Sequence, residues 1–179
     1  VLDLVCGTSL RVLLGNGDGT FHQAYRDGRA HASAMAFGDF AGDGKLDAAL
    51  CLWGQNGLTI LPGKGDGTFV RDRPMPVALD GFPAAIAAAD LDGDGHADLA
   101  VGTGGSLLVI LGKGDGTFAS PRPVAGAPGA ASIATADLDG DGRIDLVLAG
   151  GDATTALINT GGGSFRIAGT LPSSGKLRV

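Results

Sequence analysis

The chain has 179 residues, of which 44% are apolar, only 5% are aromatic and 33 are glycine. Recurring aliphatic blocks exclude disorder, and glycines without a three-residue period exclude a collagen-like chain. The formal net charge of −6 and the lack of any Lys/Arg cluster exclude a nucleic-acid partner, and apolar runs such as 82–89 are too short for membrane insertion.

Two motifs alternate along the chain at one period. A glycine motif of the form Gly-x-Gly-Asp-Gly-Thr-Phe occupies 15–21, 63–69 and 112–118, and a degraded copy ends at 161–165. An aspartate motif occupies 39–47, 90–98 and 137–145. Because both motifs return every 47–51 residues, they mark one structural repeat.

Each repeat predicts four short strands. In the last one, strands are expected at 130–136, 144–149, 153–159 and from Phe165, bounded by Gly and Asp turns. Four antiparallel strands per repeat are the size of one β-propeller blade, so the predicted fold class is all-β. The first strand of a repeat is alanine-rich, as at 84–89, which favours an inner position where blades crowd together.

The repeats divide the chain into a partial blade at 1–30 and fuller blades at 31–80, 81–128 and 129–172. Residues 173–179 are expected to start or complete another inner strand. We favour a piece of a larger propeller, because both ends fall within a repeat. The alternatives are self-association, in which several chains close the ring together, and closure by the tail of the same chain.

Aspartates at positions 1, 3, 5 and 9 of a nine-residue loop predict a calcium site, with the backbone carbonyl of position 7 as a further oxygen. Such an all-oxygen cage suits Ca²⁺ better than Mg²⁺ or a transition metal. The second loop supplies Asp90, Asp92, Asp94, Asp98 and the carbonyl of His96. The third supplies Asp137, Asp139, Asp141, Asp145 and the carbonyl of Arg143.

The first loop is a poorer candidate, because Ala41 replaces an aspartate at position 3. It retains Asp39, Asp43, Asp47 and the carbonyl of Lys45. The three loops hold 11 of the 19 acidic residues, and three Ca²⁺ would bring the formal charge from −6 to 0. An EF-hand is excluded, because position 12 is never Glu and strands flank the loops. Simple Asp/Gly turns are the alternative reading.

The aspartate loop and the Gly-Asp-Gly-Thr-Phe hairpin together resemble the FG-GAP/VCBS repeat family. That resemblance implies calcium-dependent blades, a loop that joins the first and second strands, and a ring of about seven blades. Similar repeats build the integrin α-subunit head, certain fungal lectins and propellers of secreted bacterial enzymes. This chain has fewer than four blades and departs from that number.

The remaining residues suggest packing and turn roles. The phenylalanines that follow each hairpin are expected to start the outer strand and pack in the core, and Asp18, Asp66 and Asp115 are expected to cap the turn. Cys6 and Cys51 fit buried small apolar residues, with a disulfide left open. Trp53 fits packing, exposure or a sugar-stacking platform.

No catalytic motif is visible, so an enzyme is not expected. We favour a calcium-stabilised binding or adhesion module for a protein or a glycan, located outside the cell or at its surface, where calcium is millimolar. The alternatives are a catalytic or non-catalytic portion of a secreted carbohydrate-active enzyme, and a structural piece of a cell-surface assembly.

Overall fold

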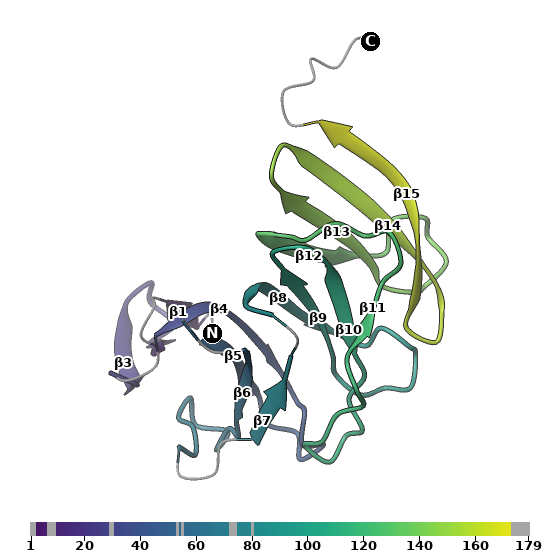
Figure 1. Ribbon diagram of the computed structural model, residues 1–179. Helices are drawn as coiled ribbons and strands as arrows, with labels where there is room; N and C mark the ends of the chain where they lie inside the picture. Colours follow the sequence, from purple (N-terminus) through teal and green to yellow (C-terminus); the bar gives the residue numbers. More distant parts are fainter. Residues whose placement is uncertain are drawn as a thin grey trace.

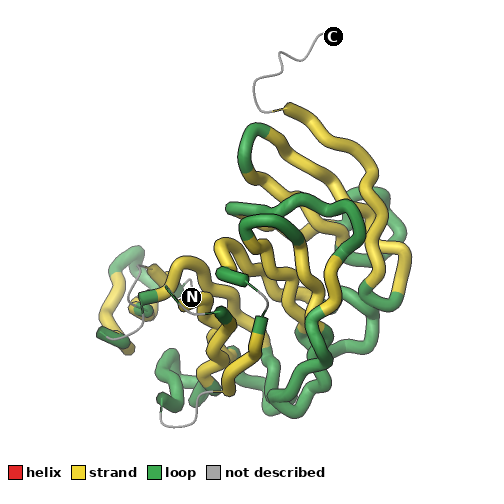
Figure 2. The backbone as a smooth tube through the Cα atoms, in the orientation of Figure 1, coloured by secondary structure: helices red, strands yellow, loops and turns green. Residues whose placement is uncertain are grey.

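The computed structural model describes residues 3–6, 10–28, 31–52, 54, 56–71, 75–79 and 81–172. They form four antiparallel sheets of three or four strands, which follow one another along an arc (Figure 1). The described chain consists of strands and loops (Figure 2), and it contains no helix long and apolar enough to cross a membrane. The all-β fold of propeller blades is thereby confirmed.

The strands follow chain order within each sheet. The first two sheets contain β1 (Leu4–Cys6), β2 (Arg11–Gly15) and β3 (Phe21–Arg26), then β4 (Ala32–Gly38), β5 (Asp47–Leu52), β6 (Gly57–Leu61) and β7 (Met75–Ala78). The other two contain β8 (Pro83–Ala89), β9 (Asp98–Thr103), β10 (Leu107–Ile110) and β11 (Arg122–Pro123), then β12 (Ser132–Ala136), β13 (Asp145–Gly150), β14 (Ala153–Gly161) and β15 (Ser164–Pro172). We number the sheets as blades one to four; the exact repeat boundaries stay predictions.

The register of the first strand pair is the same in three blades. The last residue of the first strand pairs with the ninth residue of the aspartate loop, in the pairs Gly38↔Asp47, Ala89↔Asp98 and Ala136↔Asp145. Each aspartate loop is therefore the tight connection between the first and second strands of its blade.

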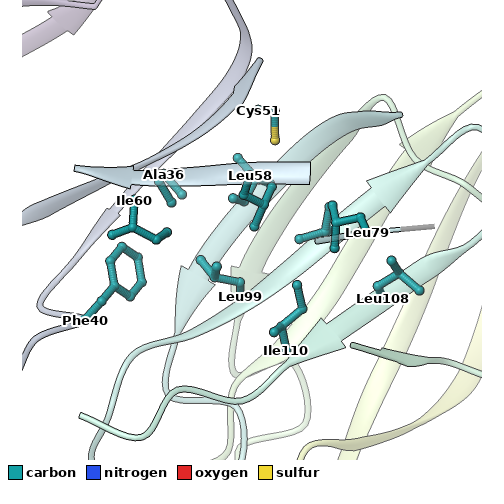
Figure 3. Packing of buried hydrophobic residues seen from close by; sticks show 12 residues of the cluster. Ala36, Phe40, Cys51, Leu58, Ile60, Leu79, Leu99, Leu108 and Ile110 are labelled. Atoms are coloured by element: carbon teal, nitrogen blue, oxygen red, sulfur yellow. The ribbon is translucent and has the colours of Figure 1, made fainter. Parts of the chain in front are cut away.

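The core lies between neighbouring blades. Separate clusters of buried apolar residues fill the interfaces between blades one and two, two and three, and three and four. The interface between blades two and three includes Phe40, Ile60, Leu99 and Ile110 (Figure 3). Strand β9 is buried along its whole length, because a neighbouring sheet covers each of its faces. This explains why the second strands are continuous apolar runs in the sequence.

The alanine-rich first strands β4, β8 and β12 lie side by side across the blades. Small side chains permit this close approach, as the composition predicted. Cys51 is a buried free thiol in β5. Trp53 and the tail 173–179 lie outside the described residues, as does the side chain of Cys6.

The outer strands differ from the prediction in two blades. Phe21 starts β3 as expected, but its side chain is exposed and does not pack in the core. Phe69 and Phe118 form only isolated bridges with Gly63 and Gly112. In blade three, proline flanks and enters the outer strand at positions 121 and 123. Proline donates no ladder hydrogen bond, so the regular strand shrinks to the two residues of β11.

Candidate functional site

All aspartate loops and glycine hairpins share one end of the blades. In an antiparallel four-stranded meander, the connection between strands one and two and the connection between strands three and four lie at the same end. The loops 39–47, 90–98 and 137–145 therefore neighbour the hairpins. This end of the molecule holds every candidate metal ligand that the sequence suggested.

Two of the loops gather three carboxylates each. The first triad is Asp90, Asp92 and Asp94, and the second is Asp137, Asp139 and Asp145. Within each triad the ligand oxygens lie within 4.8 Å of one another. Calcium–oxygen distances are about 2.3–2.6 Å, so oxygens with this spacing can share one Ca²⁺. The donor set and its spacing thus fit the ion that the sequence predicted.

Position 1 of each loop organises the turn through its carboxylate. Asp90 accepts hydrogen bonds from the N–H groups of Gly93 (2.7 Å) and Gly95 (2.9 Å), and Asp137 accepts from Gly140 (2.8 Å) and Gly142 (3.0 Å). Gly95 and Gly142 adopt φ values of +87° and +86°, which glycine tolerates best. The Asp-Gly spacing is thus a requirement of the turn as well as of a cation site.

The first loop gathers no such triad, although every residue from 39 to 47 is described. The Lys45 ammonium lies 2.7 Å from Asp43 Oδ2. A hydrogen bond from Lys45 lowers the pKa of Asp43, and Asp43 in turn raises the pKa of Lys45. In this loop the Lys45 ammonium therefore pairs with Asp43, one of the carboxylates that were expected to bind metal.

The aspartate at position 9 of each loop is buried and links its loop to the hairpin of the same blade through hydrogen bonds. Asp98 Oδ2 accepts from Leu91 N–H at 2.8 Å, and its Oδ1 accepts from Gly112 N–H at 2.7 Å. Asp47 and Asp145 make the equivalent pairs of bonds. Asp3 repeats the hairpin bond, to Gly15 N–H at 3.0 Å.

Burial raises the pKa of Asp98 to about 6. The hydrogen bonds from Gly112 and Leu91 oppose this rise, and repulsion from Asp92 and Asp94 adds to it. A cation in the triad would relieve that repulsion.

Some predicted ligands fall outside the triads. Asp98 is absent from the first triad and Asp141 from the second, and the Asp141 carboxylate pairs with the Arg143 guanidinium. Their coordination stays a prediction, as do the carbonyl ligands of Lys45, His96 and Arg143. The spacing of aspartates in the sequence does not reveal the ion pair between Asp141 and Arg143.

The hairpin aspartates have the turn role predicted for them. Asp115 Oδ1 accepts from both the N–H (2.9 Å) and the hydroxyl (2.6 Å) of Thr117. The bond from the hydroxyl is the main reason why the pKa of Asp115 is lowered. Asp18 with Thr20 and Asp66 with Thr68 form the same arrangement.

The repeated architecture matches a known family. The model of the FG-GAP-like repeat matches residues 39–101 and 90–148, which together span more than half of the chain. The chain belongs to the FG-GAP-like repeat family. A comparison with curated proteins finds no match.

Solved structures support the same fold. A lectin from Agrocybe aegerita, described as recognising non-reducing terminal N-acetylglucosamine, is similar with a TM-score of 0.62 at 24% identity, over 93% of this chain and 47% of the lectin. The Tc holotoxin pore of Photorhabdus luminescens is similar with a TM-score of 0.50 at 21% identity, over 92% of this chain and 9% of the toxin chain. This FG-GAP-like chain therefore spans less than half the length of either protein.

The family repeat also builds a recurring groove that the sequence analysis missed. The grooves between blades two and three and between blades three and four lie between the outer part of one blade and the hairpin of the next. The groove between blades one and two extends further, to Asp3 and Val5 and to the aspartate-loop residues 44–46. The same three hairpin positions line every groove, namely Gly67-Thr68-Phe69, Gly116-Thr117-Phe118 and Gly163-Ser164-Phe165. Only the packing of successive blades creates these grooves, so one repeat read alone could not show them.

Proposed function

We propose that this domain is a calcium-stabilised, non-catalytic module that binds glycans in the grooves between blades. The observation that carries the proposal is the recurrence of the same three hairpin positions in a groove at each of three blade interfaces. The grooves between blades one and two and between blades two and three have volumes of about 730 and 540 Å³, within the usual range for small-ligand pockets. The groove between blades three and four is smaller, at about 200 Å³.

The lining of the grooves suits a sugar. Each groove combines the phenyl ring of a hairpin with a hydroxyl side chain, as in Phe118 with Thr117 and Phe165 with Ser164. A sugar ring presents an apolar face and a polar rim, which these two kinds of group complement. The similarity to a lectin supports the same choice at the level of the fold.

Calcium provides the second part of the proposal. Sites made of carboxylates on extracellular modules bind Ca²⁺ with dissociation constants of about 10⁻⁴–10⁻³ M, which matches calcium outside cells and exceeds cytosolic levels. We therefore place this module outside the cell or at its surface.

A glycan microarray probed in millimolar calcium tests the binding role, followed by titration calorimetry with N-acetylglucosamine as the first probe. Ala119→Trp fills the groove between blades two and three, and Ala125→Trp fills the groove between blades three and four. Each variant should lose the glycan binding of its own groove. Ala131→Trp is the matched control, because Ala131 is exposed and lines none of these grooves.

Undiminished glycan binding by both variants would contradict binding in these two grooves and would leave the groove between blades one and two as the site. The absence of any bound glycan on the array, with the fold intact by circular dichroism, would contradict the proposed ligand class.

A further inference from the structure

Asn159 holds the position that is glycine in the other three hairpins. It precedes Phe165 by six residues, and the equivalent residues are Gly15, Gly63 and Gly112. A Cβ atom at Gly112 would lie 2.2 Å from the Ala97 carbonyl oxygen, so that blade admits no side chain there. Blade four admits one, and Asn159 is 98% buried, with an exposed fraction of 2%.

Asn159 contacts the aspartate loops of two blades at once. Its side-chain Nδ2 donates to the carbonyl of Leu91 in blade three, at 2.8 Å. Its backbone N–H donates to Asp145 Oδ1 in blade four, at 2.7 Å, and Nδ2 also donates to the carbonyl of Ile144 at 3.0 Å. Its Oδ1 accepts from Gly161 N–H at 2.9 Å, and its backbone carbonyl accepts from Arg143 Nε at 3.2 Å, so every polar group of the residue is engaged.

One contact is with a triad member, and the other is with a residue between two triad members. Leu91 lies between two members of the first triad, Asp90 and Asp92, and its side chain is 1% exposed in the core between blades three and four. Asp145 is itself a member of the second triad. A rearrangement of either loop that displaces Leu91 or Asp145 would therefore act on a hydrogen-bond partner of Asn159.

The interface between blades two and three uses different chemistry. There the carbonyl of Phe40, which is equivalent to Leu91, accepts from the backbone N–H of Gly116 at 2.8 Å. The loop that contains Phe40 has no carboxylate triad. A side chain therefore links the two aspartate loops at the interface between blades three and four, where both loops hold a triad.

We propose that Asn159 is a positioning residue that couples the two triads, so that Ca²⁺ in one raises the affinity of the other. Coupling between two binding sites is reciprocal, because it is a difference of binding free energies. Typical coupling corresponds to a change in affinity of about fivefold or more. This inference rests on the calcium part of the proposed function and not on its glycan part.

The test measures calcium midpoints loop by loop, by hydrogen exchange of the amides in 90–98 and 137–145. Asp139→Ala disables the second triad without removing a hydrogen bond shown for that residue. It should raise the midpoint of loop 90–98 by about fivefold or more. Asp92→Ala should raise the midpoint of loop 137–145 by the same factor.

The shift should vanish when Asp139→Ala is compared with its parent in an Asn159→Ala background. Thr160→Ala is the matched control, since Thr160 bonds only within the hairpin, to the Ser164 carbonyl at 3.1 Å. The shift should persist in that background.

Three outcomes would overturn the proposal. One is a midpoint at 90–98 that Asp139→Ala leaves unchanged in the chain with native Asn159, a comparison that holds even if Asn159→Ala does not fold. Another is a shift that survives in Asn159→Ala. A lack of calcium-dependent protection in both loops would remove the metal assignment as well.

Discussion

The ninth aspartate of each loop acts as a structural residue in its own right. In the first loop, Asp47 is 1% exposed and accepts hydrogen bonds from Phe40 (3.0 Å), Ala41 (3.1 Å) and Gly63 (2.7 Å). Buried hydrogen bonds to a charged acceptor are stronger than neutral ones, and an N–H left unpaired in the interior is costly. This loop gathers no metal triad, so the structural role can be measured there alone.

Replacing Asp47 with alanine should lower the free energy of unfolding by about 3 kcal/mol or more, because three N–H groups lose their acceptor. The loss should be the same in calcium and in EGTA. Urea unfolding in both buffers measures it. Asp43→Ala is the control and should change stability little, since its ion pair with Lys45 is exposed. A calcium-dependent loss in Asp47→Ala would show that this loop binds metal after all.

Restoring the missing aspartate should create a third metal site. Ala41 occupies the position of Asp92 and Asp139, which are triad members in the other loops. We expect Ala41→Asp to raise the calcium stoichiometry from two to three, measured by titration calorimetry. Ala41→Asn, which adds the same bulk without the charge, should bind the third ion more weakly or not at all. An unchanged stoichiometry of two would indicate that Lys45 blocks the loop.

The sequence predicted the carboxylates but not the full set of partners around them. Spacing alone identified the members of both triads, because alternate positions of a curled loop point inward. It did not show that Arg143 pairs with Asp141, nor that Asn159 reaches Leu91 across 68 residues of chain. Those contacts depend on how side chains pack between blades, and no local pattern encodes that packing.

At the scale of elements, the aspartate loops of blades two and three pack against the hairpin of the next blade. The loop of blade two approaches the hairpin of blade three so closely that a Cβ at Gly42 would lie 2.3 Å from the Gly114 carbonyl oxygen. A Cβ at Gly114 would in turn lie 2.4 Å from the His96 ring. Glycine at Gly42 therefore permits the contact between blades, and glycine at Gly114 permits the contact between hairpin and loop within blade three.

Gly42→Ala should therefore destabilise the protein more than Gly44→Ala. Both residues have positive φ, of +68° and +79°, and alanine pays about 1–2 kcal/mol for such a conformation. Only Gly42 also faces a backbone clash, because a Cβ at Gly44 would meet nothing within 4 Å. Urea unfolding of the two variants gives the comparison. Equal losses would mean that the contact between the loop and the next hairpin adjusts without cost.

The positions of strands could be predicted from the sequence where a single physical effect determined their composition. The apolar second strands and the alanine-rich first strands were expected, because burial and crowding each leave a compositional pattern. The predicted start of the outer strands in blades two and three was wrong. Hairpin phenylalanines there make isolated bridges only, since the pairing of an edge strand depends on the backbone donors that follow.

At the scale of the whole molecule, the buried interfaces between blades control access to Cys51. This thiol is fully buried in β5, and burial raises its pKa to about 12 from 9.0. Since the folded pKa exceeds the unfolded one, the folded state disfavours the thiolate. The stability contributed by this group is intact below pH 9 and falls as pH rises from 9 toward 12.

In a Cys6→Ser background, raising the pH from 7 to 10 should cost about 1.4 kcal/mol more in the protein with Cys51 than in Cys51→Ala. The comparison cancels the other groups that titrate in this range. Urea unfolding at both pH values provides the measurement. An identical pH dependence of the two proteins would place Cys51 in contact with solvent.

Calcium should affect more than the two loops, because Asn159 links them across the interface between blades three and four. Two ions would add four positive charges and bring the formal net charge from −6 to −2. At 10 mM calcium and a dissociation constant of about 10⁻⁴ M, each site stabilises the folded state by about 2.7 kcal/mol. For a chain of this size, two sites correspond to a rise in Tm of about 10–20 °C.

Thermal melts in calcium and in EGTA measure the rise, and the double variant Asp92→Ala with Asp139→Ala should lose most of it. A full calcium response in that double variant would show that the stabilising ions bind elsewhere, and a wild-type Tm that ignores calcium would make the aspartate loops ordinary turns.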